Sequence, residues 1–276
     1  MKLRLVYAVL VLVAVLAGCA APRPVADTSC RSSTVLLDSH FDGGQLGLCT
    51  VSGDGTFELT LFPEDAPPIN KSPWFAFRVS GQPGDSVQFR LTFEDGNARY
   101  WPKMSRDGEI WQPLPADSVT RSADDSRMNF SLLLDQARVW ISAQEVLTDE
   151  YYRRWLNERS AHPAIETRLV AISNEGRPVY LAETPDRPET VLLIGRQHPP
   201  EVTGAIAMRA FIATVMADTP LSSDFRNRFK VAIIPLVNPD GVAGGHWRHN
   251  TGSVDLNRDW GPFTQPETQG IRRWLD

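Results

Sequence analysis

Residues 191–217 read VLLIGRQHPPEVTGAIAMRAFIATVMA, and this stretch decides the fold of the C-terminal part of the chain. The short apolar run Val191–Gly195 predicts a buried strand, and the longer apolar run Val202–Ala217 predicts a helix. A second short run, Val231–Val237, predicts another buried strand. Because such strands alternate with a helix, we expect an α/β domain with a mixed, largely parallel sheet.

The chain before this stretch adds a helix and a hairpin. Thr148–Arg159 has a cap residue and an apolar side, which predicts a helix. Arg168–Ser173 and Val179–Glu183 flank an Asn-Glu-Gly turn and predict a hairpin. The pattern of short strands ends near residue 145, so we assign residues 146–276 to the α/β domain.

Residues 33–145 have the pattern of an all-β domain. Phe57–Leu61 and Val87–Leu91 alternate between apolar and polar side chains, which is typical of half-buried strands. Gly, Asp and Asn clusters supply turns between six or more such strands, and no convincing helix interrupts them. We therefore expect a β-sandwich domain here, ahead of the α/β domain.

The composition excludes one class of partner. The chain has 276 residues, of which 42% are hydrophobic and 22% charged, and its net charge is -5. These values are typical of a globular protein long enough for two domains. Because no basic patch or run stands out, we expect no nucleic-acid partner.

The N-terminus predicts export. Lys2 and Arg4 precede the apolar run Leu5–Leu16, which is too short to span a bilayer and is typical of a secretory signal. We therefore assign residues 1–18 to a signal peptide. A short membrane anchor that stays attached is the alternative.

Leu16-Ala17-Gly18-Cys19 resembles the lipobox of bacterial lipoproteins. The resemblance implies that Cys19 is the lipidated first residue of the mature protein and that residues 19–32 contain a tether to the membrane. Ala20 after the cysteine implies an outer-membrane lipoprotein that faces the periplasm. A plain cleaved signal remains the alternative.

Cys30 and Cys49 are the other two cysteines. An exported protein lives in an oxidising compartment, where a disulfide between them is expected. The alternative is two unpaired thiols, and their spacing does not indicate a metal site.

The loop Arg196–Glu201 follows a predicted strand and precedes a helix, where α/β sheets bind ligands. His198 and Glu201 carry an imidazole and a carboxylate, both ordinary zinc ligands. Pro199 and Pro200 fix the turn between them. The alternative is a structural turn with Glu201 favoured by the helix dipole.

A second group of polar residues follows the strand Val231–Val237. It comprises Asn-Pro-Asp-Gly at 238–241, Trp247-Arg248, and Asp-Leu-Asn-Arg at 255–258. Two arginines in such loops suit an anion, because guanidinium groups stay charged and match carboxylates. The alternatives are an ordinary turn at 238–241 and a surface ion pair at Arg258.

In this order, the two groups resemble the zinc carboxypeptidase family, whose members resemble carboxypeptidase A. Arg-x-His-Pro-x-Glu and Asp-Leu-Asn-Arg are similar to the cytosolic carboxypeptidase-like subgroup, which has a β-sandwich before its catalytic domain. The resemblance covers residues 190–267 well and residues 55–145 loosely.

The resemblance implies a role for each residue of the motifs. His198 and Glu201 would bind zinc, and Asp255 would orient His198. Arg248 would be catalytic and polarise the scissile carbonyl of the substrate. Asn257 and Arg258 would bind the substrate's C-terminal carboxylate.

The family's third ligand is a later His, and a Tyr and the general-base Glu follow it. His246 and His249 come too early for the third ligand, and Glu267 sits at a helix start and is not a credible base. We therefore expect residues 146–276 to be the N-terminal part of a zinc carboxypeptidase domain, inactive by itself.

The expected function is hydrolysis of C-terminal peptide bonds in peptides of the bacterial cell envelope, with zinc as cofactor. The alternative is a non-catalytic lipoprotein that binds peptide C-termini. Under both hypotheses we expect the protein to bind peptides with a free C-terminal carboxylate and to attach to a membrane through the lipid anchor.

Overall fold

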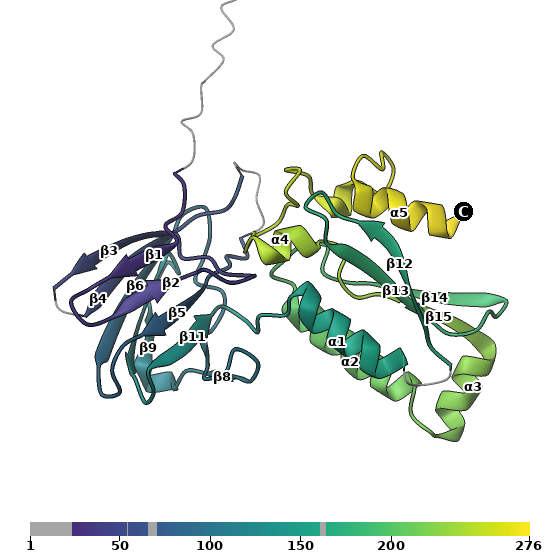
Figure 1. The fold of residues 1–276 in the computed structure, drawn as a ribbon, viewed down its shortest axis with the longest axis horizontal. Coiled ribbons are helices and arrows are strands. Elements are labelled where there is room, and N and C mark those ends of the chain that lie inside the picture. The colour runs from purple at the N-terminus through teal and green to yellow at the C-terminus, as the bar shows by residue number, and fades with distance from the viewer. Residues whose placement is uncertain (1–23, 54, 66–70, 161–163) are drawn as a thin grey trace, which may run out of the picture.

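The computed structural model describes residues 24–53, 55–65, 71–160 and 164–276. Figure 1 shows a strand-rich N-terminal part beside a C-terminal part that contains the longer helices. The predicted signal peptide and Cys19 lie outside the described residues. Ser29–Arg31, which the sequence analysis placed in the tether, form the first strand, β1.

The N-terminal part contains two sheets, and a strand-rich N-terminal domain is confirmed. One sheet has the order β1-β2-β5-β11-β7-β8, formed by β1, β2 (Leu36–Asp38), β5 (Ala76–Ser80), β11 (Arg138–Ser142), β7 (Lys103–Ser105) and β8 (Trp111–Pro113). The other has the order β3-β4-β6-β10-β9, formed by β3 (Leu48–Ser52), β4 (Thr56–Leu61), β6 (Ser86–Phe93), β10 (Arg127–Leu133) and β9 (Val119–Arg121), with a 3₁₀ helix η1 (Ala116–Ser118) before β9.

Aromatic side chains join the two sheets. Along β6, buried and exposed residues alternate at every position, as the sequence pattern predicted. Phe77 of β5 and Phe89 of β6 belong to different sheets, and their ring centroids are 5.4 Å apart. Phe89 also stacks on Phe130 of β10 at 4.8 Å. The buried faces of the two sheets therefore share one aromatic core.

A disulfide joins Cys30 of β1 to Cys49 of β3, so the pairing expected from the sequence is present in the structure. The two strands belong to different sheets. Because the bond links residues 19 positions apart, it limits the freedom of the unfolded chain and contributes on the order of 3 kcal/mol to stability.

The C-terminal part contains one sheet of order β12-β13-β15-β14. Its elements are α1 (Asp149–Ser160), β12 (Glu166–Ile172), β13 (Pro178–Glu183), β14 (Glu189–Ile194), α2 (Val202–Val215), α3 (Pro220–Arg228), β15 (Phe229–Ile234), α4 (Pro239–Ala243), the 3₁₀ helix η2 (Leu256–Arg258) and α5 (Pro266–Leu275).

The sheet is mixed, as predicted, but the prediction that it is largely parallel was wrong for the described residues. Only β14 and β15 pair in parallel, whereas β13 pairs antiparallel with β12 and with β15. The short turn between β12 and β13 imposes the antiparallel pair, because parallel neighbours need a longer crossover. β14 lies at the edge of the sheet and is half-buried, not buried as its apolar sequence predicted.

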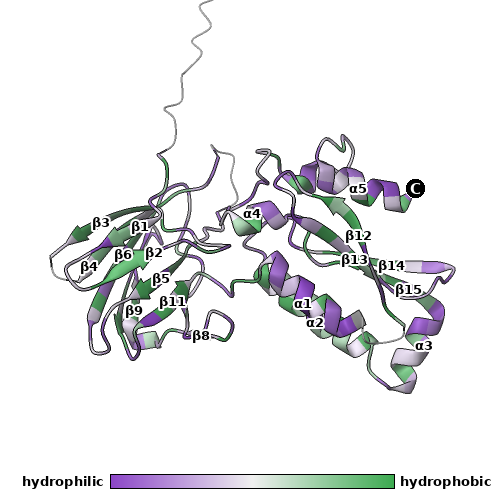
Figure 2. Cartoon of the chain, in the orientation of Figure 1, coloured by the Kyte–Doolittle hydropathy of each residue, from purple (hydrophilic) through white to green (hydrophobic). Residues whose placement is uncertain are grey.

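Helices cover both faces of this sheet (Figure 1). Val231 and Ile233 of β15 belong to the core that contains α1 and α2, whereas Ala232 and Ile234 pack with Ile271 of α5. Figure 2 shows that α1 and α5 also carry polar residues, in keeping with one buried and one exposed face. Among the described residues, no single helix is long and apolar enough to cross a membrane. Only α2 and α3 taken together meet that condition, and they are bent by 101°.

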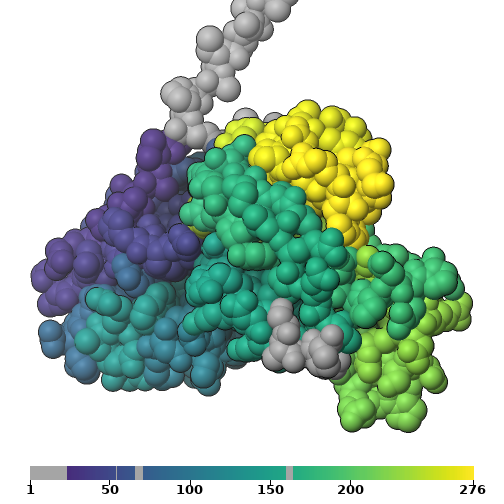
Figure 3. All heavy atoms as spheres, turned by 45° about the vertical axis from the view of Figure 1, so that its right-hand side comes forward, coloured from purple at the N-terminus to yellow at the C-terminus, as the bar shows by residue number. Residues whose placement is uncertain are grey.

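The two parts of the chain are in contact (Figure 3). Gly43 donates its backbone N–H to Ala243 O at 2.7 Å, and the Trp74 indole donates to Gly43 O at 2.7 Å. Trp247, from the C-terminal part, is 1% exposed, and its indole donates to Trp74 O at 3.1 Å. The strand-rich part therefore reaches the loop that carries Arg248.

Candidate active site

His198 and Glu201 lie in the loop between β14 and α2, where the sequence placed them. His198 is only 6% exposed. Its Nδ1 lies 2.7 Å from Glu201 Oε1. Glu201 is the N-cap residue of α2, but its side chain makes no capping hydrogen bond. The carboxylate is therefore directed to His198 and not to the helix N-terminus.

Arg196 holds this loop in place. Its backbone has φ 52°, a left-handed conformation that is unusual for a residue with a side chain. The guanidinium is buried and donates to Pro199 O at 3.0 Å, to Leu147 O at 3.3 Å and to the Tyr152 hydroxyl at 3.4 Å. The surrounding hydrogen bonds stabilise the strained backbone next to His198.

Asn238, the first residue of Asn-Pro-Asp-Gly, also supports the loop. Its side chain caps α4 by accepting a hydrogen bond from Gly241 N at 2.9 Å. The Asn238 amide donates to Gln197 O at 3.2 Å, which fixes the backbone beside His198. Asp240 is fully buried and accepts hydrogen bonds from the Ser173 hydroxyl and from Glu175 N. The motif is thus a structural support and not only a turn.

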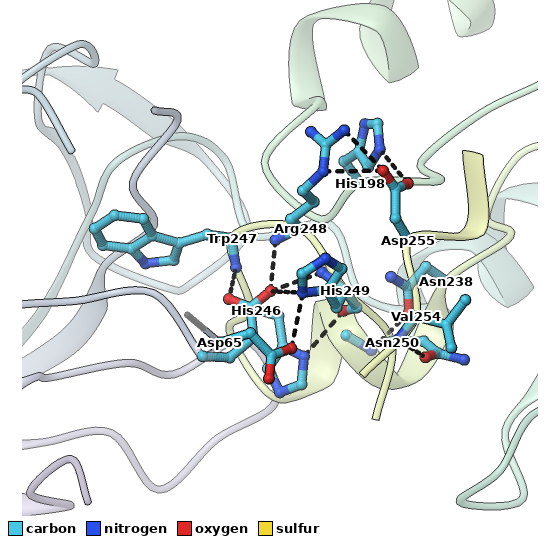
Figure 4. A network of polar contacts seen from close by, with 12 residues as sticks. Asp65, His198, Asn238, His246, Trp247, Arg248, His249, Asn250, Val254 and Asp255 are labelled. Carbon is cyan, nitrogen blue, oxygen red and sulfur yellow. Dashed lines mark hydrogen bonds and ion pairs between the residues drawn. The ribbon is translucent and has the colours of Figure 1, made fainter. Parts of the chain in front are cut away.

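Asp255 connects His198 with Arg248 (Figure 4). Its Oδ1 lies 2.9 Å from His198 Nε2, on the ring side opposite Glu201. Its Oδ2 accepts a hydrogen bond from Arg248 Nε at 3.0 Å and lies 2.7 Å from Nη2. In the sequence these three residues belong to separate motifs. In the structure their side chains are in contact.

Asn257 and Arg258 lie in η2, directly after Asp255, and both are exposed. The backbone N–H of Asn257 donates to Asp255 Oδ1 at 3.0 Å. No hydrogen bond or ion pair joins the Arg258 side chain to another residue in the described part of the chain. This observation disagrees with the alternative of a surface ion pair within those residues.

Comparison with known proteins assigns the chain to a family. Residues 152–273 match the zinc carboxypeptidase family, and residues 37–144 match the N-terminal domain of cytosolic carboxypeptidases. Residues 152–273 therefore belong to the zinc carboxypeptidase family. The resemblance drawn from the motifs is thereby confirmed.

Several relatives share both parts. Mouse cytosolic carboxypeptidase 6 is 24% identical, over 89% of this chain and 50% of its own length. Cytosolic carboxypeptidase 2 of Xenopus tropicalis is 31% identical, over 81% of this chain and 27% of its own length. The chain therefore spans half or less of these two relatives.

Solved structures share the fold. A metallo-carboxypeptidase from Burkholderia cenocepacia has a TM-score of 0.73 and 21% identity, over 88% of this chain and 67% of its own. A metallo-carboxypeptidase from Pseudomonas aeruginosa, solved with (2-guanidinoethylmercapto)succinic acid, has a TM-score of 0.73 and 24% identity, over 87% of this chain and 66% of its own.

The residues around His198 fit the zinc ion that this carboxypeptidase family uses. Burial opposes a charged imidazole, but hydrogen bonds to Glu201 and Asp255 outweigh it and raise the pKa of His198. Contacts with His198 lower the pKa of both carboxyl groups, although burial acts against them. The donors Nδ1 and Oε1 are ordinary zinc ligands, and a carboxylate holds the other ring nitrogen, as is usual at metal sites.

A second group of ligand-type side chains comprises Glu64, Asp65 and His249, whose atoms lie within 4.8 Å of one another. His249 and His246 were expected to be loop residues. His249 Nδ1 lies 2.7 Å from Asp65 Oδ2, and His246 Nδ1 lies 3.0 Å from His249 O. Glu64 was not predicted from the sequence, because no motif surrounds it.

Glu267 of α5 is fully buried, and neither carboxyl oxygen has a hydrogen-bond partner among the described residues. Burial raises the pKa of Glu267, and the negative charges of Asp240 and Asp259 add to the effect. The folded state therefore favours the protonated carboxyl more strongly than the unfolded state does.

We expect Glu267→Gln to stabilise the folded chain at pH 7–8, because the neutral amide removes the cost of ionising a buried carboxyl group. A raised folded pKa means that wild-type stability falls as pH rises from the unfolded value of 4.5 through the folded value. The gain should therefore disappear near pH 4. Urea unfolding at pH 4 and pH 7.5 measures the free energy of unfolding of the variant and the wild type. If the variant differs from wild type by the same amount at both pH values, the buried carboxyl does not cause the effect.

Proposed function

We propose that this chain forms part of a zinc carboxypeptidase that removes C-terminal residues from peptides. The observation that carries the proposal is the arrangement around His198, with Glu201 on Nδ1 and Asp255 on Nε2. Arg248 contacts the same Asp255. A metal-binding pair and a guanidinium at one site suit hydrolysis of a peptide carbonyl.

His198 and Glu201 would hold the zinc ion. When bound, zinc lowers the pKa of a water molecule and polarises the carbonyl of the scissile bond. Asp255 would keep the His198 ring in place and leave Nδ1 free of its proton, because the carboxylate accepts from Nε2–H. Asn238 and Arg196 would keep the loop backbone fixed.

Two arginines would contact the substrate at different points. Arg248 would stabilise the negative charge that develops on the carbonyl oxygen. Arg258 is exposed and has no partner among the described residues, so its guanidinium is available for the substrate's terminal carboxylate. Asn257, next to it, would add an amide to the same contact.

The proposal concerns a longer protein than the matched region. A catalytic zinc usually has three protein ligands, and a general base must reach the bound water. The curated relatives extend beyond the matched part, since the chain covers 50% of mouse cytosolic carboxypeptidase 6. We infer that the further zinc ligand and the general base come from sequence that corresponds to the unmatched part of these relatives. Residues 146–276 would then form the first part of an α/β domain. Residues 33–145 would form a β-sandwich before it.

The cellular setting rests on the N-terminal sequence. Lys2, Arg4, the apolar run that follows and Cys19 support an envelope lipoprotein that is anchored in the outer membrane and faces the periplasm. Its substrates would then be envelope peptides with a free C-terminal carboxylate. Retention of the protein in membranes, and its release in a Cys19→Ala variant, would test this setting.

The decisive experiment uses the full-length protein and a blocked dipeptide. We expect hydrolysis of the free acid, little hydrolysis of the C-terminal amide, loss of activity with a chelator and recovery with zinc. His198→Ala should lose both zinc and activity. Hydrolysis that survives zinc removal would refute the proposal, and tight binding without hydrolysis would support a non-catalytic protein that binds peptide C-termini.

A further inference from the structure

The carboxylate of Glu64 binds the backbone of the loop that carries Arg248. Its Oε2 accepts a hydrogen bond from Trp247 N at 2.6 Å. Its Oε1 accepts from Arg248 N at 2.8 Å and from His249 N at 2.7 Å. One side chain from the strand-rich part thus receives three consecutive backbone N–H groups of the C-terminal part.

Three neighbouring contacts hold the same loop against the strand-rich part. The Trp247 indole is buried and donates to Trp74 O at 3.1 Å. Gly96 lies against this ring, because a Cβ at Gly96 would come within 2.8 Å of Trp247 Cζ3. His249 Nδ1 lies 2.7 Å from Asp65 Oδ2. The flanking residues of Arg248 are therefore fixed on both sides.

The Arg248 side chain points away from Trp247, toward His198 and Asp255 (Figure 4). It is 16% exposed and ends at Asp255, the residue that also contacts His198. The position of the guanidinium therefore depends on the place where Glu64 holds the Arg248 backbone. We propose that Glu64 is a positioning residue that sets the place of Arg248 in the active site.

This proposal rests on the proposed function, since it assigns Glu64 a role in the same hydrolysis. It also explains the group formed by Glu64, Asp65 and His249 without a metal ion. Backbone N–H groups already occupy both oxygens of the Glu64 carboxylate. Charge-assisted hydrogen bonds of this kind are stronger than neutral ones and fix geometry.

Glu64→Gln is the variant that tests the role, because it keeps the shape of the side chain but leaves one acceptor oxygen for three donors. In the full-length zinc enzyme we expect kcat to fall by up to about 10²-fold, the effect of a small misplacement of a catalytic group. KM and zinc content should stay close to wild type. Glu94→Gln, an exposed position of the same strand-rich part, is the matched control and should leave kcat unchanged.

A double variant separates positioning from a general loss of structure. If Glu64 acts through Arg248, then Glu64→Gln should lower kcat no further in an Arg248→Ala background. An equal fold-loss in both backgrounds would overturn the proposal. Glu64→Asp, which keeps the charge on a shorter side chain, should lie between wild type and Glu64→Gln.

Amide hydrogen exchange tests the contact without any assay of activity. Exchange at residues 247–249 should be faster in Glu64→Gln than in wild type, and unchanged in Glu94→Gln. Unchanged exchange in Glu64→Gln would overturn the positioning role alone. A wild-type enzyme that holds zinc but hydrolyses no peptide would instead refute the proposed function, whatever the exchange result.

Discussion

Arg248→Ala should lower kcat by about 10²–10³-fold and change KM much less. The guanidinium lies against Asp255, with Nη2 at 2.7 Å from Oδ2, and Asp255 in turn contacts His198. Asp255 thus links Arg248 to the proposed metal ligand His198. A donor there interacts most strongly with the charge that forms on the carbonyl oxygen during attack, and such an interaction raises kcat more than it improves substrate binding.

Arg248→Lys is the matched variant for this prediction. Lysine keeps the positive charge but lacks the planar fork that pairs with Asp255, so we expect only partial recovery of kcat. Zinc content should be measured in both variants, because Asp255 also orients His198. A rise in KM with an unchanged kcat would mean that Arg248 binds the substrate and does not stabilise the transition state.

Sequence patterns predicted those parts of the fold in which local residues decide the outcome. The alternation in β6 predicted its buried face, and the Asn-Glu-Gly turn predicted the β12–β13 hairpin. The direction in which neighbouring strands pair could not be predicted in this way, because it depends on strands that are distant in the sequence. β13 lies next to β15, and the run Val231–Val237 is apolar on both faces, so nothing in it indicates a parallel or an antiparallel neighbour.

The candidate site shows the same division. His198, Glu201 and Asp255 were predicted from motifs because their side chains carry the chemistry, and the structure brings them into contact. Glu64 could not be predicted. It lies 183 positions before Trp247. Its hydrogen bonds in that loop go to backbone N–H groups, and the only side chain of the loop it meets is His249, whose Nδ1 lies 3.7 Å from Glu64 Oε1 in the described structure. The identities of the loop residues therefore leave little complementary signal.

The strand-rich part therefore contributes contacts to the candidate site. Glu64 and the residues around Trp247 come from opposite parts of the chain, and the core is continuous across them, since Trp247 packs with Trp74. A C-terminal domain expressed alone would expose the Trp247 indole and leave three N–H groups of its loop without the carboxylate. The two parts together form the environment of Arg248.

Arg258→Ala should raise KM by about 10- to 100-fold, because a hydrogen bond to a charged group contributes about 1.5–3 kcal/mol. The substrate's terminal carboxylate is charged in the ground state and in the transition state alike, so its loss weakens binding in both. The kcat should fall only through mispositioning of the substrate. The two arginine variants should therefore differ in kind, one in kcat and the other in KM.

The contrast between a free acid and an amide makes the Arg258 prediction specific. The wild-type full-length enzyme should prefer a blocked dipeptide with a free carboxylate over its C-terminal amide, and Arg258→Ala should lose most of that preference. Arg273→Ala, which removes a charge from α5, controls for a general electrostatic effect and should keep it. If Arg258→Ala leaves both KM and the preference unchanged, Arg258 does not bind the carboxylate, and the preference for free C-termini must come from another residue.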